Sequence, residues 1–196
     1  MGALLAVLTP LRLVNEAALA LGRAIGIVAV AAMVVAILVQ VFFRYVLNNA
    51  LPWPDEAARF CMLWMTGLMA PTAFRRGAFV AIDTLIQFLP KRAGALLSLV
   101  LLVVSLMVML VAVQIGWSEV TGFAGRFATA SLYVPLDLSF ETWLRVPRSW
   151  MMASLLVGLV MLISVNIELI LRSIVKLMGG GDLLPAITIE EQVGAE

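Results

Sequence analysis

The chain has 196 residues, of which 63% are hydrophobic and 13% are charged, and its mean hydropathy is +1.09. A water-soluble fold of this composition would expose far too much apolar surface, so we predict an integral membrane protein. The net charge of +1 does not indicate a nucleic-acid partner, and one cysteine with no histidine excludes an internal disulfide, the usual haem ligand and the commonest general base. We therefore predict no catalytic, cofactor-binding or metal-binding residue.

The first 23 residues are predicted to form an amphipathic helix. Arg12, Asn15, Glu16 and Arg23 fall within an arc of about 100°, and the other face is leucine, valine and alanine. This pattern is typical of a helix that lies at the membrane surface. A cleaved signal peptide is the alternative, but the basic residues come late and no small-residue cleavage site follows the apolar run. We expect the segment to stay in the mature protein.

Four apolar runs are predicted to cross the membrane, which makes the fold an all-α membrane protein. The uncharged runs are residues 24–43, 60–74, 93–118 and 149–167. The second run is too short alone, so its helix is predicted to begin at Pro54, with Asp55 and Glu56 facing the positive end of the helix dipole. The predicted organisation is an interfacial segment (1–23), a four-helix transmembrane domain (24–176) and a flexible tail (177–196).

The connections between spans carry the remaining predicted elements. The segment 75–92 places basic residues around an amphipathic middle that contains Asp83, which predicts a loop helix. In the long connection 119–148, Ser139 could cap a short helix in which Glu141 and Arg145 pair, before Pro147 ends it.

The distribution of basic residues predicts the orientation in the membrane. With both termini in the cytoplasm, eight lysines and arginines lie inside and five lie outside. Trp53, Trp117, Trp143 and Trp150 then all fall near the outer boundary, where indole rings prefer the headgroup level.

The stretch from Arg44 to Arg59 concentrates charge at the mouth of the first helical hairpin. Asp55 and Arg59 have the spacing of an i,i+4 pair, and Arg44 would face Glu56 across the turn. Three interpretations stay open: the charges close the hairpin and anchor it, they contact another membrane subunit, or they contact substrate. Closure of the hairpin needs the fewest assumptions.

Two polar residues and two pairs of small residues provide further packing signals. Gln40 and Gln114 fall near the outer ends of the first and third spans, where they could hydrogen-bond between helices. The spacings Gly22-xxx-Gly26 and Ser154-xxx-Gly158 would permit close helix approach, although such spacings are common in membrane helices.

The two charged motifs, RYVLNNALPWPDEAARF and RRGAFVAIDTLIQFLP, resemble the small membrane subunit of tripartite ATP-independent periplasmic (TRAP) transporters. The resemblance covers about residues 20–175, including the four-span layout, but Phe79 stands where a histidine is common in that family, and residues 133–147 match poorly. The residues that match the family pattern, and that the resemblance assigns to a subunit interface or hairpin charge network, are Arg44, Tyr45, Asn48, Trp53, Asp55, Glu56, Arg59, Arg75, Arg76 and Asp83.

The resemblance implies a role in secondary transport. In that family a periplasmic binding protein captures an organic acid, and a large membrane subunit moves it across the bacterial inner membrane, driven by a sodium gradient. The small subunit would brace the large one, surrounded by membrane lipids, and offer part of the docking surface for the binding protein. Spans without a cluster of acidic and basic residues suit such a brace.

Two other classes remain as alternatives. A membrane anchor subunit of a respiratory or redox enzyme also has few spans, although the missing histidine argues against any version that binds haem. A small autonomous channel or exporter is the third class. Paired repeats with broken helices, which mark many transporter sites, are not evident in residues 24–74 and 93–167.

Overall fold

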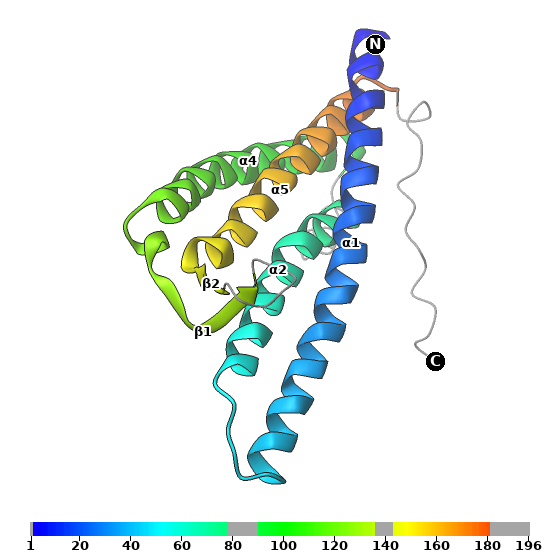
Figure 1. Cartoon of the computed structure of the whole chain (residues 1–196). Coiled ribbons are helices and arrows are strands. Elements are labelled where there is room, and N and C mark those ends of the chain that lie inside the picture. The colour runs from blue at the N-terminus through cyan, green and yellow to red at the C-terminus, as the bar shows by residue number, and fades with distance from the viewer. Residues whose placement is uncertain (1, 78–89, 136–142, 181–196) are drawn as a thin grey trace, which may run out of the picture.

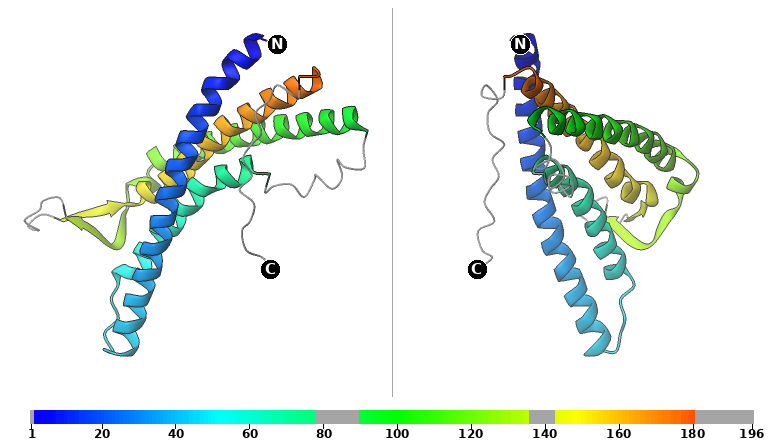
Figure 2. Two further views of the ribbon diagram at one scale, coloured as in Figure 1. Left: turned by 90° about the vertical axis from the view of Figure 1, so that its right-hand side faces the viewer. Right: turned by 180° about the vertical axis from the view of Figure 1, so that it is seen from behind.

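The computed structural model describes residues 2–77, 90–135 and 143–180, and these are mostly helical. Figure 1 shows a long helix, α1 (Gly2–Tyr45), which runs the height of the molecule beside α2 (Trp53–Arg75). Two further long helices follow, α4 (Lys91–Thr121) and α5 (Arg148–Leu177), and Figure 2 shows that α1 crosses both obliquely. The predicted loop helix around Asp83 lies outside the described residues, as does most of the predicted tail.

The predicted N-terminal segment and the first span form one unbroken helix. α1 has 44 residues, and Pro10 lies inside it. The polar arc of its first third turns toward the other helices, since Asn15 is buried. Placement of residues 1–23 at the membrane surface stays a prediction.

Three of the four predicted spans are long and apolar enough to cross a membrane: Ala6–Tyr45, Ala93–Thr121 and Arg148–Leu177. α2 is helical over 23 residues and begins as predicted, with proline in its first positions followed by Asp55 and Glu56. Its charged and polar residues lower its mean hydropathy, and α2 is not among the helices that qualify as candidate membrane spans. The chain is therefore a membrane protein with four long helices among its described residues, three of them clear candidates for spans.

The connection 119–148, which the predicted orientation places outside, folds differently from the prediction. A 3-10 turn, η1 (Ala124–Arg126), leads into strand β1 (Ala128–Pro135), which pairs antiparallel with β2 (Trp143–Pro147). The predicted helix ending at Pro147 is wrong for residues 143–147, and the all-α prediction misses this small sheet. Ser139 and Glu141 lie outside the described residues. The strands contain Thr129, Tyr133, Val134 and Val146, whose branched or aromatic side chains favour extended backbone.

The helices approach one another through small residues. A Cβ added at Gly67 of α2 would clash with the carbonyl oxygen of Ser154, and one at Gly158 of α5 would lie 2.5 Å from the carbonyl oxygen of Gly67. Gly22 and Gly26 of α1 similarly face Leu68 and Met69 of α2. Both predicted small-residue spacings therefore lie at helix contacts, where the missing side chains let backbones come close.

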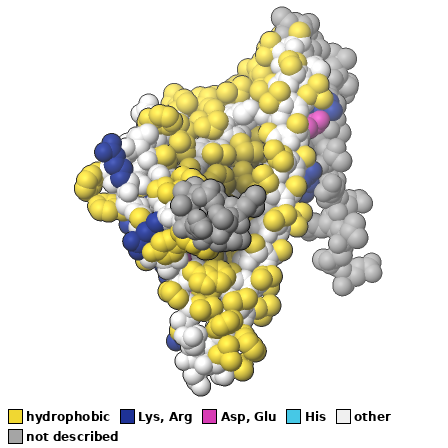
Figure 3. Space-filling model, in the orientation of Figure 1, with side chains coloured by type: hydrophobic (Ala, Val, Ile, Leu, Met, Phe, Trp, Pro, Cys, Tyr) yellow, Lys and Arg dark blue, Asp and Glu magenta, His cyan; other side chains and the backbone are white. Residues whose placement is uncertain are grey.

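The outside of the molecule is largely apolar, as Figure 3 shows for one face. α4 packs mainly against α5, and the amide of the fully buried Asn166 donates to the carbonyl of Leu102 across that contact, at 3.2 Å. Many large aliphatic side chains of α1 and α4 are exposed. In a membrane these faces are available to lipid or to a partner helix.

Candidate functional site

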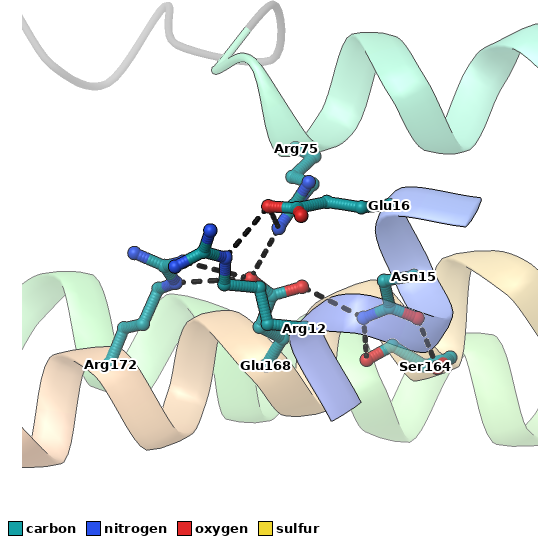
Figure 4. Close-up of polar contacts among 7 residues, drawn as sticks. All are labelled: Arg12, Asn15, Glu16, Arg75, Ser164, Glu168 and Arg172. Atoms are coloured by element: carbon teal, nitrogen blue, oxygen red, sulfur yellow. Dashed lines mark hydrogen bonds and ion pairs between the residues drawn. The ribbon is translucent and has the colours of Figure 1, made fainter. Parts of the chain in front are cut away.

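A fully buried carboxylate, Glu168 on α5, lies at the centre of the most extensive polar network among the described residues (Figure 4). Its Oε1 accepts from Nη2 of Arg75 at 2.7 Å and from Nε of Arg172 at 3.1 Å. Its other oxygen, Oε2, accepts from Nδ2 of Asn15 at 2.8 Å. The buried charge is thus compensated by two guanidinium groups and an amide, as a charge removed from water requires.

A second tier extends the network toward the surface. Glu16 accepts from Nε of Arg12 at 2.7 Å and from Nη2 of Arg75 at 3.4 Å. The hydroxyl of Ser164 donates to Oδ1 of Asn15 at 2.6 Å. The Glu168 cluster is defined here as Arg12, Asn15, Glu16, Arg75, Ser164, Glu168 and Arg172.

Helical spacing explains how the sequence builds this cluster. On α5, Ser164, Glu168 and Arg172 follow one another at four-residue intervals and so share one face. On α1, Asn15 and Glu16 point from the same side of the helix toward α5 and α2. Arg75 reaches them from the last turn of α2, where a positive charge also favours the helix dipole.

The Glu168 cluster holds three helices, α1, α2 and α5, together. Its two carboxylates are matched by three arginines, so each acid already has a cationic partner. Within the part of the chain that the structure describes, no three His, Cys, Asp or Glu side chains come together as a metal ion would require. Loss of one partner would leave an uncompensated buried charge and should therefore destabilise the protein.

Sequence reasoning did not find this cluster. The prediction concerns spans that end at Ile167, and it uses Arg172 only for the orientation. Glu168 and Arg172 lie just beyond that limit on the same helix, where both are buried. The signal that was available is the i,i+4 spacing of Glu168 and Arg172 directly after an apolar run.

A second polar site joins the start of α2 to the outer hairpin. The carboxylate of Glu56 accepts from the backbone N–H of Ala130 at 2.8 Å, from the N–H of Ser131, and from the hydroxyl of Ser131 at 2.7 Å. The same hydroxyl also contacts the carbonyl of Pro52 at 2.8 Å. The register of the sheet shifts between Ala128 and Tyr133, and this irregularity turns consecutive N–H groups toward one carboxylate.

The predicted ion pairs of the first hairpin are not formed. Glu56 bonds to β1 rather than to Arg44, and Asp55 accepts a long 3.5 Å contact from Gln40 rather than pairing with Arg59. The ion pairs that the structure shows among its described residues are Arg12–Glu16, Arg75–Glu16, Arg75–Glu168 and Arg172–Glu168. Arg44 and Arg59 are exposed, and the Arg44 guanidinium lies 5.8 Å from the ring centre of Tyr45.

The other predicted site residues are distributed between the two ends of α2. Asn48 has a positive φ of 49° in the turn, which asparagine tolerates better than most residues, and Trp53 is exposed at the start of α2. Arg75 belongs to the Glu168 cluster, and Arg76 follows it at the end of α2. Asp83 lies outside the described residues. The structure therefore divides the predicted set into a group at the α1–α2 turn and a group at the end of α2.

Comparison with known proteins decides the family. Residues 33–176 match the model of the DctQ component of tripartite ATP-independent periplasmic transporters. The chain belongs to this family. No curated protein and no solved structure matches the chain. The matched range runs from the last third of α1 to the last turn of α5, and so includes Glu56, Arg75 and Glu168.

As a DctQ component, the chain is the small membrane subunit of a TRAP transporter, and this family contains transporter components rather than enzymes. The match confirms the resemblance drawn from the two charged motifs. It excludes the redox-anchor alternative as the family of this chain. The α1 residues of the Glu168 cluster, Arg12, Asn15 and Glu16, precede the matched range.

Proposed function

We propose that this DctQ component braces the large membrane subunit of a sodium-driven transporter, which takes up an organic acid delivered by a periplasmic binding protein. In this proposal α2 also crosses the membrane, as the second of four spans, both termini lie in the cytoplasm of a bacterium, and the protein resides in the inner membrane. The outer hairpin would contribute to the surface on which the binding protein docks.

The observation that carries the proposal is that Arg44 and Arg59 are exposed and unpaired within the described residues. Both are exposed at the mouth of the α1–α2 hairpin, and neither has an ion-pair partner among the described residues. Charges near the edge of the hydrocarbon layer are costly without partners. Carboxylates or backbone carbonyls of a larger membrane subunit would supply those partners, so this finding favours subunit contact over closure of the hairpin.

A second observation supports a static role. The Glu168 cluster ties α1, α2 and α5 at one end, and the contact of Gly67 with Ser154 and Gly158 ties α2 to α5 further along. A helix bundle fastened at two levels resists relative sliding of its helices. Such rigidity suits a brace for a moving partner.

Reconstitution into liposomes tests the proposed function. The isolated subunit should show no sodium-dependent uptake of an organic acid, and uptake should begin when the large subunit and the binding protein are added. Uptake by the isolated chain that is lost on mutation of Gln40 or Gln114 would contradict the brace and indicate a minimal transporter.

Co-purification tests the proposed contact. Arg59→Ala should lower the yield of complex with the large subunit while the isolated variant stays folded. Arg145→Ala is a matched control, because it removes an equally exposed charge that already has a partner within the chain: its guanidinium donates to the carbonyl of Ala130. Normal complex formation with a tenfold loss of apparent substrate affinity would instead assign Arg59 to substrate contact.

A further inference from the structure

An exposed group of two phenylalanines and two arginines lies where α4 meets the outer hairpin. We define it as the Phe–Arg corner, which consists of Phe123, Arg126, Phe127 and Arg148. The N–H of Arg126 donates to the carbonyl of Phe123 at 3.2 Å, and the N–H of Arg148 donates to the carbonyl of Phe127 at 2.8 Å. The first bond lies within the η1 turn, and the second joins the first residue of α5 to the residue that ends this turn.

The rings of the Phe–Arg corner are unusually open. Phe123 is 77% exposed, which is the largest value among the exposed large hydrophobic residues of the described chain, and Phe127 is 52% exposed. The two rings pack edge to face, with centroids 5.0 Å apart. Rings of this size in contact with water are costly, so the corner is expected to be covered when the protein is in its native setting.

The charges of the Phe–Arg corner also lack an ion-pair partner among the residues that the structure describes. Arg126 and Arg148 are both exposed, and no ion pair joins either of them to a carboxylate in the described ranges. Glu119, two turns upstream, is exposed as well and pairs with neither. Figure 3 shows basic side chains among hydrophobic ones at this end of the molecule. The corner therefore combines two exposed arginines with two exposed rings on neighbouring backbone positions.

The position of the corner indicates the depth at which it lies. The uncharged run of α4 ends at Ser118, and Trp117, one residue earlier, is exposed. Trp150 is exposed in the first turn of α5. Indole rings favour the boundary between hydrocarbon and headgroups, so the residues that follow Ser118 fall at the level of the lipid phosphates.

The backbone of the corner is held in place by a glycine. A Cβ added at Gly125 would lie 2.5 Å from the carbonyl oxygen of Val120 and 2.8 Å from that of Glu119. The η1 turn thus packs directly on the last turn of α4. Arg126 is presented from a fixed backbone rather than from a loose loop.

We propose that the Phe–Arg corner binds the phosphate of an anionic phospholipid, with Arg126 and Arg148 holding the phosphate and the rings of Phe123 and Phe127 entering the upper acyl region. Guanidinium groups match phosphate oxygens in geometry as well as charge. The rings distinguish a lipid from an acidic protein surface or a free anion, since they need hydrocarbon beside the phosphate. This inference does not depend on the proposed brace.

Native mass spectrometry of the full chain tests the proposal. The protein is released from detergent that contains equal amounts of phosphatidylglycerol and phosphatidylcholine, and the retained lipids are counted. The native protein should retain more phosphatidylglycerol than phosphatidylcholine. In the variant Arg126→Gln/Arg148→Gln the ratio of the two retained lipids should fall by about fivefold for each arginine removed. Arg145→Gln, which makes the same change of charge per residue at a guanidinium engaged with Ala130 and Tyr133, should keep it.

Two further measurements distinguish a lipid phosphate from free phosphate, and a control detects variants that misfold. Phe123→Ala/Phe127→Ala should weaken retention of phosphatidylglycerol, while inorganic phosphate at millimolar concentration should not displace the lipid. Equal retention by the double arginine variant would overturn the proposal, as would displacement by phosphate alone. Unchanged lipid retention together with weaker capture of the periplasmic binding protein would assign the corner to that protein instead. Each variant is first compared with the native protein in thermal unfolding, and a double variant that fails to fold is replaced by its two single variants.

Discussion

Arg75, in the last turn of α2, donates from Nη2 to Oε1 of Glu168 at 2.7 Å, and the side chain of Glu168 is fully buried on α5. The two residues are 93 positions apart in the sequence. Their contact joins two helices at a point where the carboxylate is closed off from water and the arginine side chain is only 10% exposed. Loss of one partner here should therefore cost much more than loss of one partner of an exposed ion pair.

Removal of Arg75 should destabilise the protein strongly. Arg75→Ala leaves the buried carboxylate with one guanidinium fewer, which should cost about 3 to 5 kcal/mol of stability. Arg12→Ala is the control, because Arg12 pairs with Glu16 where the side chains are 29% and 41% exposed, and should cost about 1 kcal/mol or less. The measurement is the unfolding of both variants in detergent. Equal losses would show that burial of Glu168 does not set the strength of the network.

Asn15 and Ser164 should behave as a coupled pair. Asn15→Leu removes the donor to Glu168 and the acceptor for the Ser164 hydroxyl, and should cost about 1 to 3 kcal/mol. Ser164→Ala in the Asn15→Leu background should add little, since its partner is already gone. A double-mutant cycle on unfolding measures this coupling, and strictly additive losses would contradict it.

A single methyl group added at Gly158 should disrupt the crossing of α2 and α5. A Cβ there would lie 2.9 Å from the Cα of Gly67 and closer still to its carbonyl oxygen, and backbone atoms cannot move aside cheaply. Gly158→Ala should therefore lower the apparent melting temperature and weaken binding of the large subunit. Gly116→Ala is the matched control on α4, because the nearest atom to its Cβ is a Leu156 methyl at 3.6 Å. That variant should be neutral or up to about 1 kcal/mol more stable, since alanine favours a helix.

Loss of the Glu56 carboxylate should loosen the outer hairpin without unfolding the helices. Glu56→Ala leaves the N–H groups of Ala130 and Ser131 without their acceptor. Hydrogen exchange of residues 128–135 should become faster, while that of α5 stays unchanged. Asp55→Ala should have no such effect, because Asp55 makes only a 3.5 Å contact with Gln40. Unchanged exchange in Glu56→Ala would show that strand pairing alone holds the hairpin.

The proposed orientation can be checked with single cysteines in a background that lacks Cys61. An impermeant thiol reagent applied from outside should label Asn49→Cys, in the turn after α1, and should not label Asp182→Cys. Labelling of the second position alone would reverse the orientation. Both signals that motivate the test, the basic count and the tryptophan positions, are properties of the sequence.

What could be predicted from the sequence is mainly local. The start of α2 follows from Pro54, Asp55 and Glu56, three neighbours whose preferences act within one helical turn, and the structure confirms it. The helix expected before Pro147 rested on an i,i+4 pair worth a few tenths of a kcal/mol. Cross-strand contacts outweigh it, since Arg145 bonds to Ala130 and lies over the ring of Tyr133.

The Glu168 cluster was beyond prediction for a different reason. Asn15 and Glu168 are 153 residues apart, and nothing in either helix alone says that the two polar faces meet. The arc of Arg12, Asn15 and Glu16 has the same pattern whether it faces lipid headgroups or a buried carboxylate. Only the packing of α1 against α5 distinguishes the two cases.

The unbroken course of α1 has a mechanical consequence. Asn15, in the Glu168 cluster, and Arg44, at the mouth of the hairpin, lie 29 positions apart on the same helix. This separation corresponds to about 43 Å, more than the hydrocarbon core of about 30 Å. A stiff rod of this length cannot change its tilt at one end alone. A partner that presses on Arg44 would therefore shift the opposite end of α1 against α5, so that strain applied on one side of the bilayer is felt by a charge pair on the other.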